Sequence, residues 1–189
     1  PAGISLTTIG ATYTENFNSL ASTGSDIPFV NDSTLPGWYV SRPWYTASNI
    51  AVNASGGSIY SYGQTASNTE RALGSVASSG TGTLNYGVRL VNNSGSTISS
   101  FEISFTGEQW RKASNANAHS LSMSYRQAPM ITDLGGTYIP IPNLTFTTPV
   151  FNTNPAVQLN GNLVENRISL TSTLEVIIPP GEEVMLRWS

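Results

Sequence analysis

Apolar and polar residues alternate one by one over several short segments of this chain, and that period constrains the fold more than any other feature. Such segments are Tyr86–Leu90, Phe101–Thr106, Ser120–Tyr125 and Val184–Trp188. A period of two describes a strand with one face on a core and the other in water. No segment long enough for a helix keeps an apolar stripe free of Gly, Pro or clustered Ser and Thr. The chain therefore predicts an all-β protein.

Turn-forming residues separate the predicted strands. They include Asn92-Asn-Ser-Gly-Ser, Gly135-Gly136 and Pro179-Pro180-Gly181. Many short strands divided by such turns are typical of an antiparallel β-sandwich of the jelly-roll type. The 189 residues suit one domain, and no repeat or linker divides them. We therefore predict a single β-sandwich domain over residues 1–189.

Composition removes several classes of function. The chain has no Cys, which excludes disulfides, thiol catalysis and Cys-ligated metals. Its formal net charge is −3, and Arg111-Lys112 is the only basic pair, which argues against a nucleic-acid partner. No apolar run approaches the length that spans a bilayer, so we expect no membrane insertion.

The polar residues are mostly uncharged. The chain contains 26 Ser, 21 Thr and 17 Asn, while charged residues make up only 10%. A surface of hydroxyls and amides is more typical of secreted proteins than of cytosolic ones, which stay soluble through mixed charge. The sequence starts at Pro1 without Met, which fits removal of an export signal or an edited start. We expect an extracellular or cell-surface location.

Several motifs occur in an order that resembles a known kind of module. They are Tyr13-Thr-Glu-Asn-Phe-Asn-Ser-Leu, Leu35-Pro-Gly-Trp-Tyr-Val, Glu70-Arg-Ala-Leu-Gly-Ser, Gly107-Glu-Gln-Trp-Arg and Ile178-Pro-Pro-Gly-Glu-Glu-Val-Met-Leu-Arg-Trp. This order resembles jelly-roll modules of large secreted or cell-surface bacterial proteins, which often carry C-terminal sorting or anchoring signals. The resemblance implies a bacterial, non-catalytic module and names no ligand.

The end of the chain departs from that resemblance. In similar proteins the Leu-Arg-Trp strand is followed by a further strand, whereas this chain stops at Ser189. The departure implies an open edge near residues 182–188, which a strand from residues 1–12 of another copy could fill. Alternatively, residues 1–12 form the first strand of their own sheet, or the last segment was removed. The predicted assembly residues are Ile4, Leu6, Ile9, Val184 and Leu186.

Aromatic residues offer a second kind of contact. Sugars stack on exposed Trp or Tyr rings while polar side chains take their hydroxyls. The densest stretch is Trp38–Tyr45, and a further aromatic stands at Trp110. The alternative is that Trp38, Trp110 and Trp188 fill the core. For a site that binds extracellular polysaccharide we predict Arg42, Trp44, Tyr45, Trp110 and Arg111.

Catalytic patterns are weak. His119 is the only histidine, and no Gly-x-Ser-x-Gly motif precedes a helix. For a glycosidase, Glu102 and Glu108 are the nearest sensible pair of carboxylates, but Glu102 alternates with core residues and is expected to face water. Glu70 and Arg71 predict a structural ion pair, with a ligand-facing Arg71 as the alternative. We expect no enzymatic activity and assign no catalytic residue.

Cofactors are not expected, with one exception. Asp26 and Asp32 flank a short loop that could hold a structural calcium ion with help from carbonyl oxygens. We therefore predict a non-catalytic extracellular structural or adhesive module, a self-assembling surface or filament subunit joined by strand complementation. Its partners would be other copies of itself. A carbohydrate-binding module for extracellular polysaccharide is the alternative.

Overall fold

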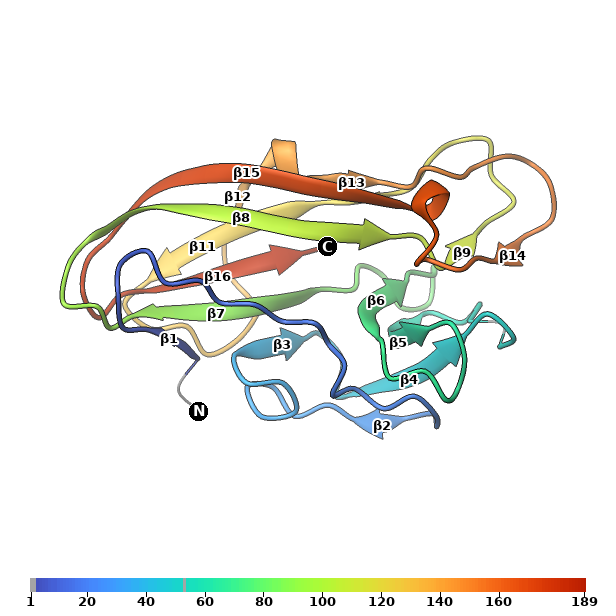
Figure 1. Ribbon diagram of the computed structural model, residues 1–189, viewed down its shortest axis with the longest axis horizontal. Coiled ribbons are helices and arrows are strands. Elements are labelled where there is room, and N and C mark those ends of the chain that lie inside the picture. The colour runs from blue at the N-terminus through green and yellow to red at the C-terminus, as the bar shows by residue number, and fades with distance from the viewer. Residues whose placement is uncertain (1–2, 53) are drawn as a thin grey trace.

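The structure, a computed structural model, describes residues 3–52 and 54–189, and strands dominate it (Figure 1). One layer is a six-stranded sheet. Its strands are β1 (Ile4–Leu6), β3 (Trp38–Val40), β7 (Tyr86–Asn92), β11 (Met123–Ala128), β12 (Ile139–Pro140) and β16 (Glu183–Trp188). The facing layer is a ribbon of two long strands, β8 (Ile98–Glu108) and β15 (Arg167–Ile178).

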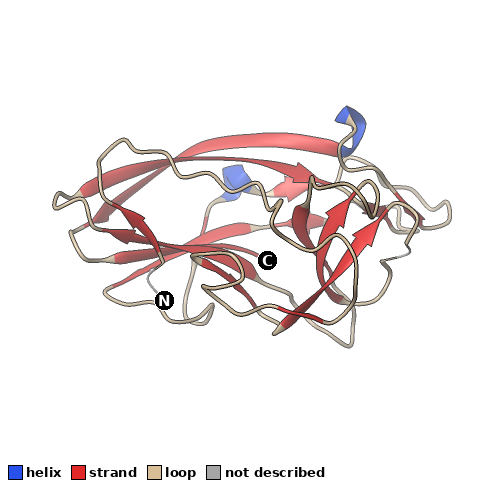
Figure 2. Cartoon of the chain, turned by 60° about the horizontal axis from the view of Figure 1, so that its bottom comes forward, coloured by secondary structure: helices blue, strands red, loops and turns tan. Residues whose placement is uncertain are grey.

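Smaller strands extend these two layers at the right of Figure 1. The largest group is a four-stranded sheet of β2 (Ile27–Pro28), β4 (Trp44–Asn49), β5 (Ser58–Gly63) and β6 (Ala72–Val76). Two short pairs join β9 (Arg111–Lys112) with β14 (Val157–Gln158) and β10 (Ser120–Leu121) with β13 (Phe146–Thr147). Figure 2 shows the two layers and the four-stranded sheet from a second side.

Two chain segments build the centre of both layers. The segment that contains β7 and β8 crosses from one layer to the other at residues 93–97, and the segment with β15 and β16 crosses at residues 179–182. In the first layer β7 pairs with β16, and in the second β8 pairs with β15. Asn92 joins the two crossings, because its Nδ2 donates to the carbonyls of Ser96 and Ile178, each at 2.8 Å.

The core lies between the layers and is rich in aromatic rings. Trp38 and Trp188 stack with their centroids 5.7 Å apart, and the edge of Phe105 meets Trp188 at 5.5 Å. Phe105 comes from the ribbon and the two tryptophans from the six-stranded sheet. Burial of such a side chain stabilises the fold by about 1.5–3 kcal/mol. The alternation in the sequence thus places the apolar face of each layer against the other.

The six-stranded sheet is also covered on its outer face. The loop of residues 129–138 lies over it, and Ile131 packs there with Tyr39 and Met185. Both Ile131 and Met185 are fully buried. The centre of this sheet therefore has a core on each side, whereas alternation alone predicts a single buried face.

The predicted all-β sandwich is confirmed, and the chain forms one compact unit. Two strand pairs differ from the expected antiparallel pairing, because β1 runs parallel to β7 and β4 runs parallel to β5. The reason in the second case is that the chain returns to the level of the start of β4 before β5 begins at Ser58. The jelly-roll order of strands stays a prediction.

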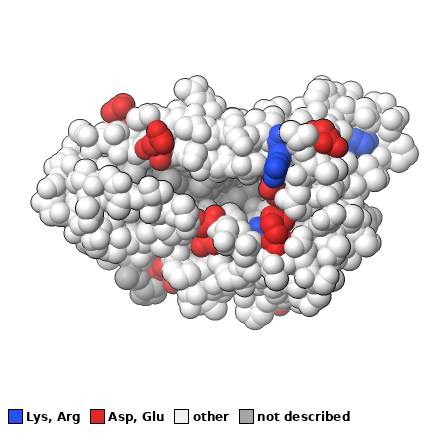
Figure 3. Space-filling model, in the orientation of Figure 1, with Lys and Arg blue, Asp and Glu red and all other residues white. Residues whose placement is uncertain are grey.

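Charged side chains are sparse on the face that Figure 3 shows, as the composition predicts. This face is hollowed in the middle, below the ribbon edge that β8 forms in the same view (Figures 1 and 3). Acidic side chains lie along the lower margin of the hollow, and basic and acidic side chains lie together at its right margin. The space between the two layers is therefore partly open to solvent along the edge of β8.

Candidate functional site

The predicted aromatic platform is divided between the surface and the core. Neighbouring residues of a strand point to opposite faces, and β4 begins with Trp44 and Tyr45. Trp44 is 40% exposed, whereas Tyr45 is only 3% exposed. The Tyr45 hydroxyl accepts a hydrogen bond from the amide of Ala21 at 3.0 Å. Tyr45 is therefore a core residue, and of this pair Trp44 alone can meet a ligand without rearrangement.

Trp110 is also a core residue, contrary to its predicted place in a binding site. Its ring stacks on Tyr62 with an interplanar angle of 4° and a centroid distance of 5.9 Å. Gly161 closes the other approach, because a Cβ there would lie 2.5 Å from the indole ring. The neighbouring Arg111 is half-buried in β9. Burial of Trp38, Trp110 and Trp188 confirms the alternative that these rings fill the interior.

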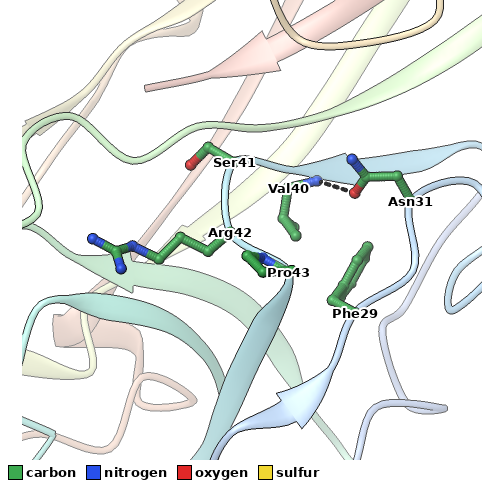
Figure 4. Close-up of a pocket in the computed structure, with 6 residues that line it drawn as sticks. All are labelled: Phe29, Asn31, Val40, Ser41, Arg42 and Pro43. Atoms are coloured by element: carbon green, nitrogen blue, oxygen red, sulfur yellow. Dashed lines mark hydrogen bonds between the residues drawn. The ribbon is translucent and has the colours of Figure 1, made fainter.

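Arg42 lies at a shallow recess of about 280 Å³. The other residues around it are Phe29, Asn31, Val40, Ser41 and Pro43 (Figure 4). The Asn31 Oδ1 accepts the amide of Val40 at 2.9 Å, which fixes one wall. Figure 4 shows the Arg42 guanidinium directed away from Phe29. The recess thus combines the apolar side chains of Phe29, Val40 and Pro43 with the Arg42 guanidinium beyond its rim.

The N-terminal segment forms part of its own sheet. Ile4 and Leu6 lie in β1, where Ile4 pairs with Leu90 and Leu6 with Asn92 of β7. Ile9 follows in a loop and is 54% exposed. The alternative in which residues 1–12 complete their own sheet is therefore confirmed for β1; Pro1 and Ala2 lie outside the described residues.

The predicted open edge at residues 182–188 is wrong. β16 pairs with β7 on one side and with β11 on the other, over its whole length. Val184 and Leu186 are buried as a result. The strand that was expected to accept a partner is therefore the central strand of the sheet, and these two residues cannot serve assembly without unfolding.

Glu70 and Arg71 do not form the predicted ion pair. The Arg71 guanidinium is buried and donates from Nε to Ser61 Oγ at 2.8 Å and from Nη2 to the carbonyls of Ser48 and Ser61. Glu70 instead accepts a hydrogen bond from Asn162 Nδ2 at 2.6 Å. The alternative of a ligand-facing Arg71 is also wrong, because its side chain ties β5 to β4.

The two aspartates of the predicted calcium loop have different surroundings. Asp26 is exposed, whereas Asp32 accepts hydrogen bonds from the amide of Gly37 at 2.8 Å and the hydroxyl of Tyr39 at 3.2 Å. Arg89 adds an ion pair to Asp32 at 3.4 Å. Donors thus occupy the oxygens that calcium would need. Across residues 3–52 and 54–189, no three His, Asp or Glu side chains form a group suited to a metal ion.

The residues that were weighed for catalysis lie apart. His119 is exposed, and its Nε2 lies 3.2 Å from Asn115 Nδ2. Glu102 and Glu108 are six residues apart on β8, which is about 20 Å along an extended strand. Burial raises the pKa of the Glu108 carboxyl, a hydrogen bond from Trp110 Nε1 at 2.9 Å opposes the rise, and the charge of Glu70 adds to it.

The β8–β15 ribbon is the feature that sequence reasoning missed. Within the described part of the chain, each of its strands pairs only with the other, so no further strand pairs with either outer edge of the ribbon. Its outer face carries opposed polar pairs such as Thr106 with Ser169 and Ser104 with Thr171. From Ser99 to Gly107, β8 contains no Lys, Arg or Pro. That run was the available signal, since natural edge strands usually carry such residues.

Comparison with protein-family models, curated proteins and solved structures finds no match. The resemblance to secreted bacterial modules therefore stays a prediction. Among the helices of the described residues, none has the length and apolarity to cross a bilayer.

Proposed function

We propose that this chain is a non-catalytic structural or adhesive module of the bacterial cell surface that assembles by adding a strand to the edge of its β8–β15 ribbon. The observation that carries the proposal is the free edge of β8, eleven residues long. Unpaired amides and carbonyls along such an edge form a template for another strand. Main-chain hydrogen bonds then supply affinity without any reactive group.

The inner face of β8 supports the same function. Phe101 and Phe105 pack against the core but are only partly buried. A strand added beside β8 would cover these rings and extend over the hollow below the edge (Figure 3). Removal of the remaining apolar surface from water contributes roughly 25 cal/mol per Å². The low charge of the chain fits close contact between subunits.

A single outward charge tests the proposal. Ser104 is exposed on β8, and Ser104→Glu places a charge beside the edge, where charged side chains oppose strand addition. We expect the native sequence to form oligomers or fibres, seen by light scattering and negative-stain microscopy, and Ser104→Glu to remain near 20.1 kDa. Ser33→Glu in an exposed loop is the matched control and should assemble normally. A native chain that is monomeric at all concentrations would contradict the proposal.

Polysaccharide binding is a second candidate, supported by the exposed ring of Trp44. A Trp surface that faces water is the element that stacks on sugar rings. Binding to insoluble polysaccharides should fall in Trp44→Ala and stay unchanged in Ile50→Ala, which removes another exposed apolar side chain. Equal binding by all three proteins would reject this site.

A further inference from the structure

We infer that the strand that pairs with β8 is the β8 of a second copy, running antiparallel about a two-fold axis at Ile103. This inference rests on the proposed function and names its partner and register. The two ribbons would join into one four-stranded sheet, in the order β15, β8, β8, β15. A contact of this kind uses the same surface on both subunits, so it requires a self-complementary strand.

The central part of β8 meets that requirement. Within three residues of Ile103, positions at equal distances on either side are of the same kind, since Glu102 matches Ser104, Phe101 matches Phe105 and Ser100 matches Thr106. The match ends beyond them, where Ser99 stands opposite Gly107 and Ile98 opposite Glu108. From Phe101 to Phe105 the inner positions are thus apolar on both sides of the centre, and the outer positions are polar. In a pair of β8 strands centred on Ile103, each of these residues faces its counterpart in the other copy.

The register follows from length and charge. Ile103 is the midpoint of Ile98–Glu108, so this register pairs all eleven residues, and any shift leaves some unpaired. A shift that centres the axis on Glu102 sets two carboxylates directly opposite each other, which destabilises a sheet. The Ile103 register instead sets Glu102 opposite Ser104. It also brings Phe101 of each copy opposite Phe105 of the other, an aromatic pair across strands.

The other edge of the ribbon is less suited to a partner. The pairing of β15 with β8 is regular from Arg167 to Glu175 and then shifts between Glu175 and Ile178. Such an irregularity bends a strand and disrupts its edge. The extra residue of the shift lies on β15, and Arg167 adds a cation at the start of that strand, whereas residues 99–107 of β8 contain no Lys or Arg. The second copy is therefore assigned to β8.

Disulfide trapping tests this register, because the chain has no cysteine of its own. Glu102→Cys and Ser104→Cys proteins, mixed and oxidised, should yield a covalent heterodimer with twice the mass of 20.1 kDa. Directly opposed residues have Cβ atoms about 5 Å apart, within reach of a disulfide after small adjustment. A mixture of Ser100→Cys with Ser104→Cys is the matched control, since Ser100 faces Thr106 in this register, and it should remain uncrosslinked.

The possible results distinguish a wrong register from a wrong proposed function. Crosslinking in the first mixture alone supports the inference. Assemblies that Ser104→Glu abolishes, with equal or no crosslinking in both mixtures, overturn this register and leave the proposed function standing. A chain that stays monomeric and forms no crosslink in either mixture overturns both.

Discussion

The six-stranded sheet and the β8–β15 ribbon face each other across one core, yet they differ in what surrounds them. The sheet is packed on both faces, and its central strand β16 has a neighbour on each side. The ribbon is packed on its inner face only, and its strands pair with no further strand among the described residues. The two layers have the same secondary structure but different surroundings.

The polar residues of the two layers differ in burial and in pairing. In the sheet, Arg89 is buried and pairs with Glu183 through Nε at 3.0 Å and Nη2 at 3.1 Å. On the outer face of the ribbon the polar groups are mostly exposed hydroxyls, such as Ser104 and Thr171. We therefore expect stability to depend more on the polar side chains of the sheet than on those of the outer face of the ribbon.

The largest expected effect is loss of the Glu183 carboxylate. Glu183→Ala leaves Arg89 short of its bidentate partner and the amide of Ile131 without its acceptor at 2.6 Å. Removal of one partner of a buried ion pair costs about 3–5 kcal/mol. We expect that loss in the free energy of unfolding, measured by urea titration. Glu175→Ala on the outer face of the ribbon is the control and should change it by less than about 0.5 kcal/mol. Equal losses of unfolding free energy in the two variants would contradict the difference between the sheet and the outer face of the ribbon.

The inner face of the ribbon should behave like the sheet. A Cβ at Gly107 would lie 2.2 Å from the ring of Phe146, so Gly107→Ala forces the packing to shift. Overpacking of this kind costs about 1–3 kcal/mol. Thermal unfolding should show a lower Tm for Gly107→Ala and little change for Gly80→Ala, where the new Cβ meets only one atom, at 4.0 Å. A tolerant Gly107 would show that the ribbon is loosely packed on both faces.

Alkaline pH tests a buried tyrosine in each of two sheets, Tyr62 in the four-stranded sheet and Tyr86 in the six-stranded sheet. Burial raises the pKa of Tyr62 and of Tyr86 above the ordinary value of about 10. A pKa that is raised in the folded state gives stability that is complete below pH 10 and is lost as pH rises further. The loss should reach about 1 kcal/mol for each tyrosine near pH 10.5. Urea titrations at pH 8 and 10.5 measure it, and Tyr86→Phe should reduce it. An unchanged pH dependence in that variant would contradict the role of Tyr86.

The smallest effect is expected on the outer face of the ribbon. Thr171 is exposed on β15 opposite Ser104, so Thr171→Lys should change the free energy of unfolding by less than about 0.5 kcal/mol. Ser124→Lys in the sheet is the contrasting variant, because Ser124 is buried beside Arg187 on the neighbouring strand. Chemical denaturation of both proteins sharpens the comparison, and a large loss in Thr171→Lys would show that the outer face is not free.

Local patterns predicted much of the fold. The strands around Phe101, Tyr125 and Val88 follow from alternation with a period of two, because that period depends only on neighbouring residues. The same rule failed for β16, since the loop of residues 129–138 buries Met185 on the face that alternation assigned to water. No local pattern reveals which distant loop will cover a face.

The candidate site depended even more on distant contacts. Trp110 was assigned to a ligand because of its polar neighbours, but Gly161, fifty-one residues later, lies against its ring. Arg71 was paired with the adjacent Glu70, yet its partners lie on β4 and β5. By contrast, the free edge of β8 has a local signature in the lack of Lys, Arg and Pro. Once the pairing of strands is known, the residues of an edge strand therefore indicate whether that edge is protected against further pairing.

The hydrogen bonds by which Asn92 joins the two crossings between the layers have a consequence for the order in which the chain folds. The strands beside it are joined across long stretches of sequence, because β7 and β8 require β16 and β15, which come last. Contacts between residues so far apart close slowly. During synthesis, β7 can pair with β1 and β3 as soon as it emerges, whereas β8 has no partner strand until β15 emerges. Any event that delays the C-terminal strands leaves both edges of β8 unpaired for longer.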